Sequence, residues 1–180
     1  DARRAVGRFL GADDTYETIF THGATDALNL LAVCLTEHMP KDGNVVITQM
    51  EHYSNYLHWE DCCRRMGTRL RVVPVLDDGS LDMDAFYSMT DRHTCAVSVT
   101  GASNVSGYRP PLREMAAYAH EKNAAFIVDA SQLVVHCRLN LEQVGYDAVC
   151  FSGHKLYGPT GIGVLCGKRK FLETLGHYQL

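Results

Sequence analysis

The stretch that decides the fold is Asp147-Ala148-Val149-Cys150-Phe151-Ser152-Gly153-His154-Lys155-Leu156-Tyr157-Gly158-Pro159-Thr160-Gly161-Ile162-Gly163-Val164-Leu165-Cys166. Two short apolar runs, 147–151 and 162–166, flank a loop rich in glycine, and each run predicts a buried strand. A parallel crossover needs a longer connection, usually a helix. We therefore expect the second strand to run antiparallel to the first.

Strands and helices alternate along the rest of the chain. Short apolar or β-branched runs predict strands at 17–21, 45–48, 70–75, 95–99 and 126–129. Helical spacing or capping signals predict helices at 2–10, 27–35, 55–66, 82–89 and 110–122, and from 168 onward. This alternation predicts an α/β fold with three layers: a seven-stranded, mostly parallel sheet, one antiparallel strand and helices on both faces. No linker or repeat interrupts it, so residues 1–180 are expected to form one domain.

Composition excludes several classes of function. The 180 residues are 46% hydrophobic and 21% charged, with a net charge of −4 and a pI near 6.1, as in ordinary soluble proteins. Without a basic stripe, a nucleic-acid partner is not expected. No apolar run reaches the length of a membrane span, and no signal peptide is visible.

The seven cysteines are odd in number, and most lie in apolar segments. Buried free thiols in a reducing compartment are therefore expected, in the cytoplasm or the interior of a reducing organelle. None of the cysteine spacings is typical of a zinc site, so no metal is predicted.

Polar side chains cluster where the predicted strands end. The clusters are 23–25, His52, Asn104, 129–132 and 152–155. Ligands of open parallel sheets bind beyond the carboxyl ends of the strands. Five strand ends carrying polar groups therefore predict a single active site at that edge.

Lys155 and Asp129 are the two side chains that specify a chemistry. A lysine amine on a glycine-rich loop can bond covalently to a carbonyl cofactor and later move protons. A carboxylate at the end of a buried strand can face a pyridine nitrogen and keep it protonated. The alternatives are a surface lysine, and an acid that only caps or pairs at a strand end. Together the two groups favour a pyridoxal phosphate site.

Weaker candidates surround this pair. Gly23-Ala24-Thr25 opens a helix whose free amides suit a phosphate, although Thr25 could equally be a plain N-cap. Ser152 and His154 could complete a phosphate site; taken alone, each is more often an ordinary polar residue.

Three further side chains could contact the cofactor ring. The flat ring of His52 could stack on it and handle protons, or His52 could be an ordinary loop histidine. Asn104 and Gln132 could donate hydrogen bonds to a ring oxygen, although an isolated amide side chain is weak evidence for a cofactor site.

Rival motifs are missing. The glycines at 158, 161 and 163 do not have the order of the dinucleotide fingerprint. The phosphate loop of nucleotide hydrolases and the G-x-S-x-G elbow of serine hydrolases are also absent.

Taken together, these segments resemble the class V, fold-type I pyridoxal phosphate enzymes, and within them the cysteine desulfurase/selenocysteine lyase family. The resemblance runs nearly end to end, and the lysine motif is its most specific part. The matching segments are Thr21-His22-Gly23-Ala24-Thr25-Asp26-Ala27-Leu28-Asn29, Met50-Glu51-His52-Tyr53-Ser54-Asn55 with Trp59, Ser103-Asn104-Val105-Ser106-Gly107, Val128-Asp129-Ala130-Ser131-Gln132 and Ser152-Gly153-His154-Lys155 with Gly158-Pro159.

The resemblance implies a role for each candidate. Lys155 would hold the cofactor as a Schiff base, Asp129 would pair with the pyridinium, and His52 would stack on the ring and act in catalysis with Lys155. Asn104 and Gln132 would lie near the ring oxygen. The phosphate would be held at Ala24, Thr25, Ser152 and His154.

The resemblance also implies a homodimer that takes sulfur from L-cysteine, leaving L-alanine and an enzyme persulfide, with a possible acceptor protein for the sulfur. Ala24 and Ala130-Ser131 depart from the family pattern only slightly. The chain is expected to be the large domain alone, without the N-terminal arm and the C-terminal small domain, and to be inactive by itself. Another class V activity (aminotransferase, epimerase or β-lyase) and an inactive cofactor-domain fragment remain alternatives.

Overall fold

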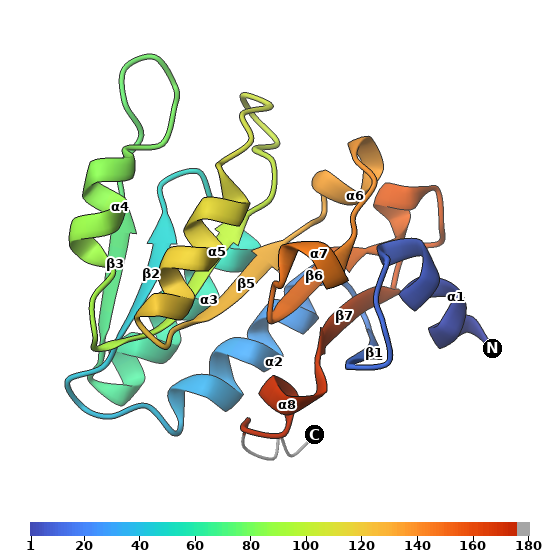
Figure 1. Ribbon diagram of the computed structural model, residues 1–180, viewed down its shortest axis with the longest axis horizontal. Helices are drawn as coiled ribbons and strands as arrows, with labels where there is room; N and C mark the ends of the chain where they lie inside the picture. The colour runs from blue at the N-terminus through green and yellow to red at the C-terminus, as the bar shows by residue number, and fades with distance from the viewer. Residues whose placement is uncertain (176–180) are drawn as a thin grey trace.

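A computed structural model describes residues 1–175 and contains one sheet of seven strands in that range (Figure 1). Their spatial order is β1-β7-β6-β5-β4-β2-β3. The strands are β1 Tyr16–Thr21, β2 Asn44–Thr48, β3 Arg69–Val73, β4 Thr94–Thr100, β5 Ala125–Asp129, β6 Ala148–Ser152 and β7 Gly163–Lys168.

Strand β7 runs against the other six. It pairs antiparallel with both β6 and β1, whereas the pairs β2–β3, β2–β4, β4–β5 and β5–β6 are parallel. The register of β6 and β7 ends at the pair Ser152 and Gly163. The expectation of one antiparallel strand after the short glycine-rich loop is confirmed. The strand expected at 70–75 ends at Val73 instead, because Pro74 has no backbone N–H to continue the pairing of this edge strand.

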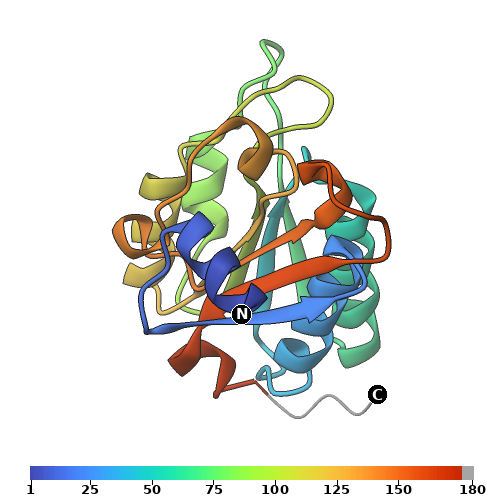
Figure 2. The same ribbon diagram turned by 90° about the vertical axis from the view of Figure 1, so that its right-hand side faces the viewer.

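Helices cover both faces of the sheet (Figure 2). On one face lie α2 and α3, and on the other lie α1, α4, α5, α6 and α7. The helices are α1 Ala2–Leu10, α2 Ala24–Thr36, α3 Tyr53–Met66, α4 Met83–Met89, α5 Leu112–Glu121, α6 Leu133–His136, α7 Leu141–Val144 and α8 Arg169–Leu172.

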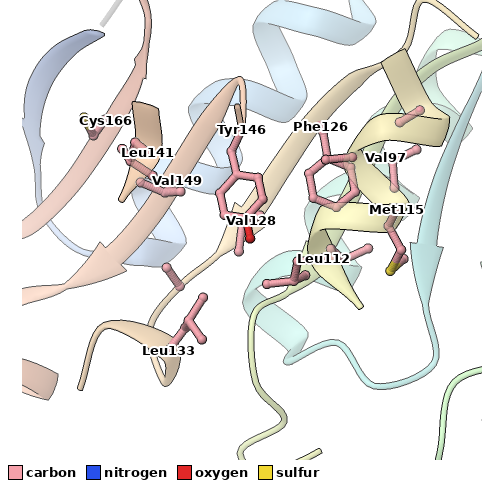
Figure 3. Packing of buried hydrophobic residues seen from close by; sticks show 14 of the residues in the cluster. Val97, Leu112, Met115, Phe126, Val128, Leu133, Leu141, Tyr146, Val149 and Cys166 are labelled. Carbon is pink, nitrogen blue, oxygen red and sulfur yellow. The ribbon is translucent and has the colours of Figure 1, made fainter. Parts of the chain in front are cut away.

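Alternate residues of each central strand pack into two separate hydrophobic cores, one on each face of the sheet. Phe126 and Val128 of β5 point into the core beneath α5, together with Met115 and Tyr146 (Figure 3), whereas Ile127 packs beneath α2 and α3. All of these side chains are almost fully buried. Burial on both faces explains why these strands are continuous apolar runs in the sequence.

Three helical features differ from the sequence-based expectation. Helix α3 begins at Tyr53 rather than near residue 55, because the side chain of His52 caps its N-terminus. Helices α6 and α7 were not predicted, since four residues are too few to show a helical period. The other predicted helices are present, with ends shifted by a few residues.

The described residues also bear on membrane and metal binding. No helix within residues 1–175 is both long and apolar enough to cross a bilayer. The same range holds no group of three or more His, Cys, Asp or Glu side chains placed to bind a metal ion.

Candidate active site

A cavity of about 200 Å³ opens at the carboxyl ends of the parallel strands. Five separate segments line it, at 24–25, 52–54, 100–104, 129–132 and 152–155. All of the site residues expected from the sequence lie on its wall, namely Ala24, Thr25, His52, Asn104, Asp129, Gln132, Ser152, His154 and Lys155. The structure thus brings the candidates together, and it adds Ser54, Thr100, Ala102 and Ser131 to the lining.

The first turn of α2 forms one end of the cavity. Its N-cap is Gly23, which has no side chain to satisfy the first helical amides, so the alternative of Thr25 as the N-cap is wrong. Thr25 lies one residue inside the helix. The amide of Ala24 donates to Ser152 Oγ at 2.8 Å, which ties the helix start to the end of β6. The next amide, that of Thr25, has no side-chain acceptor among the described residues, and a helix N-terminus with such a free amide beside hydroxyl groups suits an anion.

Close backbone packing holds this helix start in place. A Cβ atom on Gly163 would lie 2.4 Å from Cα of Gly23, a distance that real Cβ atoms essentially never show. Glycine at 163 therefore lets the loop before α2 lie directly against the first residue of β7. The position of the helix amides depends on this contact.

Asp129 ends β5 at the floor of the cavity. Its side chain is buried, and Oδ1 accepts a hydrogen bond from the Ser131 amide at 3.0 Å. Burial raises the pKa of Asp129, while the Ser131 hydrogen bonds and the charges of His52 and Lys155 oppose that rise. A buried carboxyl group that faces a cavity in this way favours a cationic ligand, because a cation would offset its desolvation.

Lys155 lies on a 3₁₀ turn, Gly153–Leu156, within the loop between β6 and β7. Backbone hydrogen bonds from Gly153 to Ile162 and from Gly158 to Gly153 brace the loop. Its side chain is exposed at the cavity wall, as are those of His52, Asn104 and His154, whereas Gln132 is half-buried. The amine is therefore accessible from the mouth of the cavity.

Sequence reasoning missed a buried polar network beneath the cavity floor. Glu51 accepts hydrogen bonds from Thr48 Oγ1 at 2.5 Å and from Asn55 Nδ2 at 2.7 Å. Asn55 Oδ1 in turn accepts from Trp59 Nε1 and Ser98 Oγ. Burial is the main cause that raises the pKa of Glu51 to about 7, and the charge of Asp129 adds to it. The only signal in the sequence is the spacing of Glu51, Asn55 and Trp59, each four residues from the next.

A larger hollow of about 660 Å³ lies at the opposite edge of the sheet, near Thr94, Ala125 and Lys168. It contains none of the expected site residues. The chemistry-bearing side chains thus gather in the smaller cavity at the carboxyl edge, where open parallel sheets bind their ligands.

The model of the aminotransferase class-V family matches residues 1–180. This chain belongs to that family. Its members, including the cysteine desulfurases, are pyridoxal phosphate enzymes. The class-V chain is 37% identical over 178 residues to a cysteine desulfurase of Klebsiella pneumoniae, and 43% identical over 173 residues to a probable cysteine desulfurase of Chlamydia trachomatis.

Solved structures agree with these relatives. The cysteine desulfurase CsdA of Escherichia coli matches 99% of the class-V chain with a TM-score of 0.93 and 30% identity. A cysteine desulfurase of Thermococcus onnurineus matches 99% of it with a TM-score of 0.92 and 31% identity. The expected family and fold are confirmed.

The match to the Klebsiella protein includes 98% of this chain but only 44% of that relative. The match to the Chlamydia protein includes 96% of this chain but only 43% of that relative. This chain likewise covers 45% and 44% of the two solved structures. It therefore spans less than half the length of the proteins that it matches.

Proposed function

We propose that this chain is the pyridoxal phosphate-binding large domain of a cysteine desulfurase-like enzyme, which takes sulfur from L-cysteine and leaves L-alanine. The observation that carries the proposal is the convergence of nine expected residues on one cavity. Similarity to proteins named cysteine desulfurases supports the choice of substrate.

The cavity fits this cofactor at both ends. The start of α2 leaves helix amides without a side-chain cap, which suits a phosphate, and Asp129 offers a buried carboxyl group, which suits a protonated ring nitrogen. The bound cofactor supplies a ring that accepts electrons from an amino-acid substrate.

The residues of the chain then divide the work. Ala24, Thr25, Ser152 and His154 would bind the phosphate, and Asn104 and Gln132 would donate hydrogen bonds to the ring oxygen. The remaining three would act at the ring and the reacting atoms. Asp129 would hold a negative charge near the ring nitrogen, His52 would contact the ring, and the Lys155 amine would hold the cofactor and move a proton at the substrate α-carbon.

The sulfur atom needs a thiol from elsewhere in the complete protein. All seven cysteines are free, and none of them lines the cavity. Desolvation raises the pKa of Cys34, Cys63, Cys95, Cys150 and Cys166, which leaves these thiols poorly suited to act as nucleophiles. We therefore place the persulfide-forming cysteine outside this chain, so the chain alone is expected to be inactive.

We further propose a homodimer that passes its sulfur to an acceptor protein and works in the cytoplasm or another reducing compartment. The free cysteines support the compartment. Size measurements by light scattering on the complete protein would test the dimer.

Turnover of amino acids by the complete protein tests the function. With L-cysteine, equal amounts of alanine and of transferred sulfur are expected, and Lys155→Ala should abolish both. Borohydride reduction followed by mass spectrometry should place the cofactor on Lys155.

Two other results would each contradict the proposal. Turnover of a different amino acid without turnover of cysteine would assign the chain to an aminotransferase, epimerase or β-lyase. Failure to find any reduced adduct at Lys155 would refute the site and favour an inactive fragment.

A further inference from the structure

The ring of His52 caps helix α3 through one of its two nitrogens. The backbone amide of Ser54 donates to His52 Nδ1 at 3.1 Å, and Ser54 Oγ lies 2.7 Å from the same nitrogen. Ser54 is thus the partner of Nδ1 through both its backbone and its side chain, and it also lines the cavity.

These two contacts decide which ring nitrogen carries the proton. A backbone N–H can only donate, so Nδ1 must offer its lone pair, and a neutral imidazole then has its hydrogen on Nε2. With Nδ1 as an acceptor, the Ser54 hydroxyl also donates to it. Within residues 1–175, Nε2 has no hydrogen-bond partner, so it is the nitrogen left for a ligand.

We propose that Ser54 is a positioning residue that fixes the tautomer of His52, so that the ring offers an N–H donor at Nε2 to whatever occupies the cavity. The consequence for catalysis rests on the proposed function, in which His52 contacts the cofactor. In this tautomer the neutral ring donates a hydrogen bond to an acceptor atom, such as an oxygen of a bound substrate or cofactor. Because Nε2 already carries a hydrogen in this tautomer, it cannot act as the base, and a second proton would have to bind at Nδ1.

The hydroxyl and the amide of Ser54 can be separated by mutation. Ser54→Ala removes the hydroxyl and keeps the amide, so Nδ1 loses one of two donors. Ser54→Thr keeps both donors. One neutral hydrogen bond changes such an equilibrium by about fivefold.

Ring-nitrogen NMR tests the proposal on the complete protein without cofactor, labelled with ¹⁵N-histidine. The His52 signals are found by comparison with His52→Gln. The wild type should show a protonated Nε2 and an unprotonated Nδ1. In Ser54→Ala the population with the proton on Nδ1 should rise about fivefold, and Ser54→Thr should restore the wild-type spectrum. A wild-type spectrum with the proton on Nδ1, or an unchanged spectrum in Ser54→Ala, would overturn the proposal.

Steady-state kinetics gives the second measurement. Ser54→Ala should lower kcat by the same factor as the Nε2–H population falls in the NMR spectrum, with little change in KM, and Ser54→Thr should recover kcat. Ser88→Ala, at an exposed serine of α4 far along the chain, should behave as wild type.

The two measurements separate the two proposals. The expected NMR spectra without turnover of cysteine would reject the proposed function and leave the role of Ser54 standing. Turnover of cysteine by a protein whose His52 carries its proton on Nδ1 would support the proposed function and reject the role of Ser54.

Discussion

Ser152 Oγ accepts a hydrogen bond from the amide of Ala24 at 2.8 Å, although the two residues are 128 positions apart in the chain. This bond joins the start of α2 to the last residue of β6, directly before the loop that carries Lys155. The helix start proposed to bind the phosphate is therefore tied to the strand end that leads into the Lys155 loop.

Ser152→Ala should weaken both the fold and the cofactor site. Removing the hydroxyl leaves the Ala24 amide without its partner, and the expected loss in free energy of unfolding is about 1 kcal/mol. Urea unfolding followed by circular dichroism measures that loss, and fluorescence titration with pyridoxal phosphate should show weaker binding. Ser88→Ala provides the matched control and should change neither quantity. An unaltered affinity would remove Ser152 from the proposed phosphate site.

Gly163→Ala should destabilise the protein by about 1–3 kcal/mol or more, because the added Cβ would overlap the backbone of Gly23. The helix start would have to move away from β7, so cofactor binding should weaken as well. Thermal unfolding and titration report the two effects. Gly7→Ala is the opposite case. Gly7 lies inside α1, and a Cβ added there would meet no atom within 4 Å, so this variant should be more stable by about 0.5–1 kcal/mol. Equal behaviour of the two variants would show that the close approach of Gly163 to Gly23 is not required.

Asp129→Asn separates a structural role from a binding role. Without cofactor, the buried carboxyl group has a raised pKa, so replacing it by a neutral amide should leave the stability at pH 8 equal to or above that of the wild type. With cofactor, kcat should fall roughly 10²-fold, because the negative charge against the ring nitrogen is lost. Unfolding of the cofactor-free protein and turnover of the loaded protein are the two measurements. A variant that unfolds easily without cofactor would show Asp129 to be structural.

Glu51 should make stability depend on pH in the cofactor-free protein. Its pKa is raised by burial from 4.5 to about 7, so the folded state holds its proton more tightly than the unfolded state. Stability from this group is therefore complete below about pH 4.5 and is lost as the pH rises through 7, by about 3 kcal/mol at most.

Glu51→Gln removes this pH dependence, because the amide stays neutral. The difference in free energy of unfolding between variant and wild type, measured from pH 5 to pH 8.5, should shift in favour of the variant as the pH rises. Glu60→Gln, at an exposed position of α3, serves as the control. A difference that stays constant with pH would show that Glu51 titrates normally.

Much of this architecture could be predicted from the sequence, because its signals are local. The connection between β6 and β7 is too short for a parallel crossover, and this alone predicts the antiparallel strand that the structure contains. The carboxyl ends of the parallel strands meet at one edge, which is why the sequence alone predicts Asp129 and Lys155 in one cavity.

What could not be predicted depends on contacts between side chains. Histidine is not among the residues that usually cap helices, so the capping of α3 by His52 has no signature in the sequence. The hydrogen bonds of Glu51 and Asn55 are likewise invisible to a pattern of apolar residues, since their partners Thr48 and Ser98 lie on two other elements, β2 and β4.

The last rung between β6 and β7, at Ser152 and Gly163, closes residues 153–162 into a ring of set circumference. A substitution inside this loop leaves its length unchanged, whereas an insertion or deletion changes the path between Ser152 and Gly163 and disturbs the backbone hydrogen bonds that hold the turn of Lys155. Related proteins should therefore differ in residues 153–162 by substitutions and not by insertions or deletions. The length of the loop thus contributes to the position of Lys155 alongside the hydrogen bonds within it.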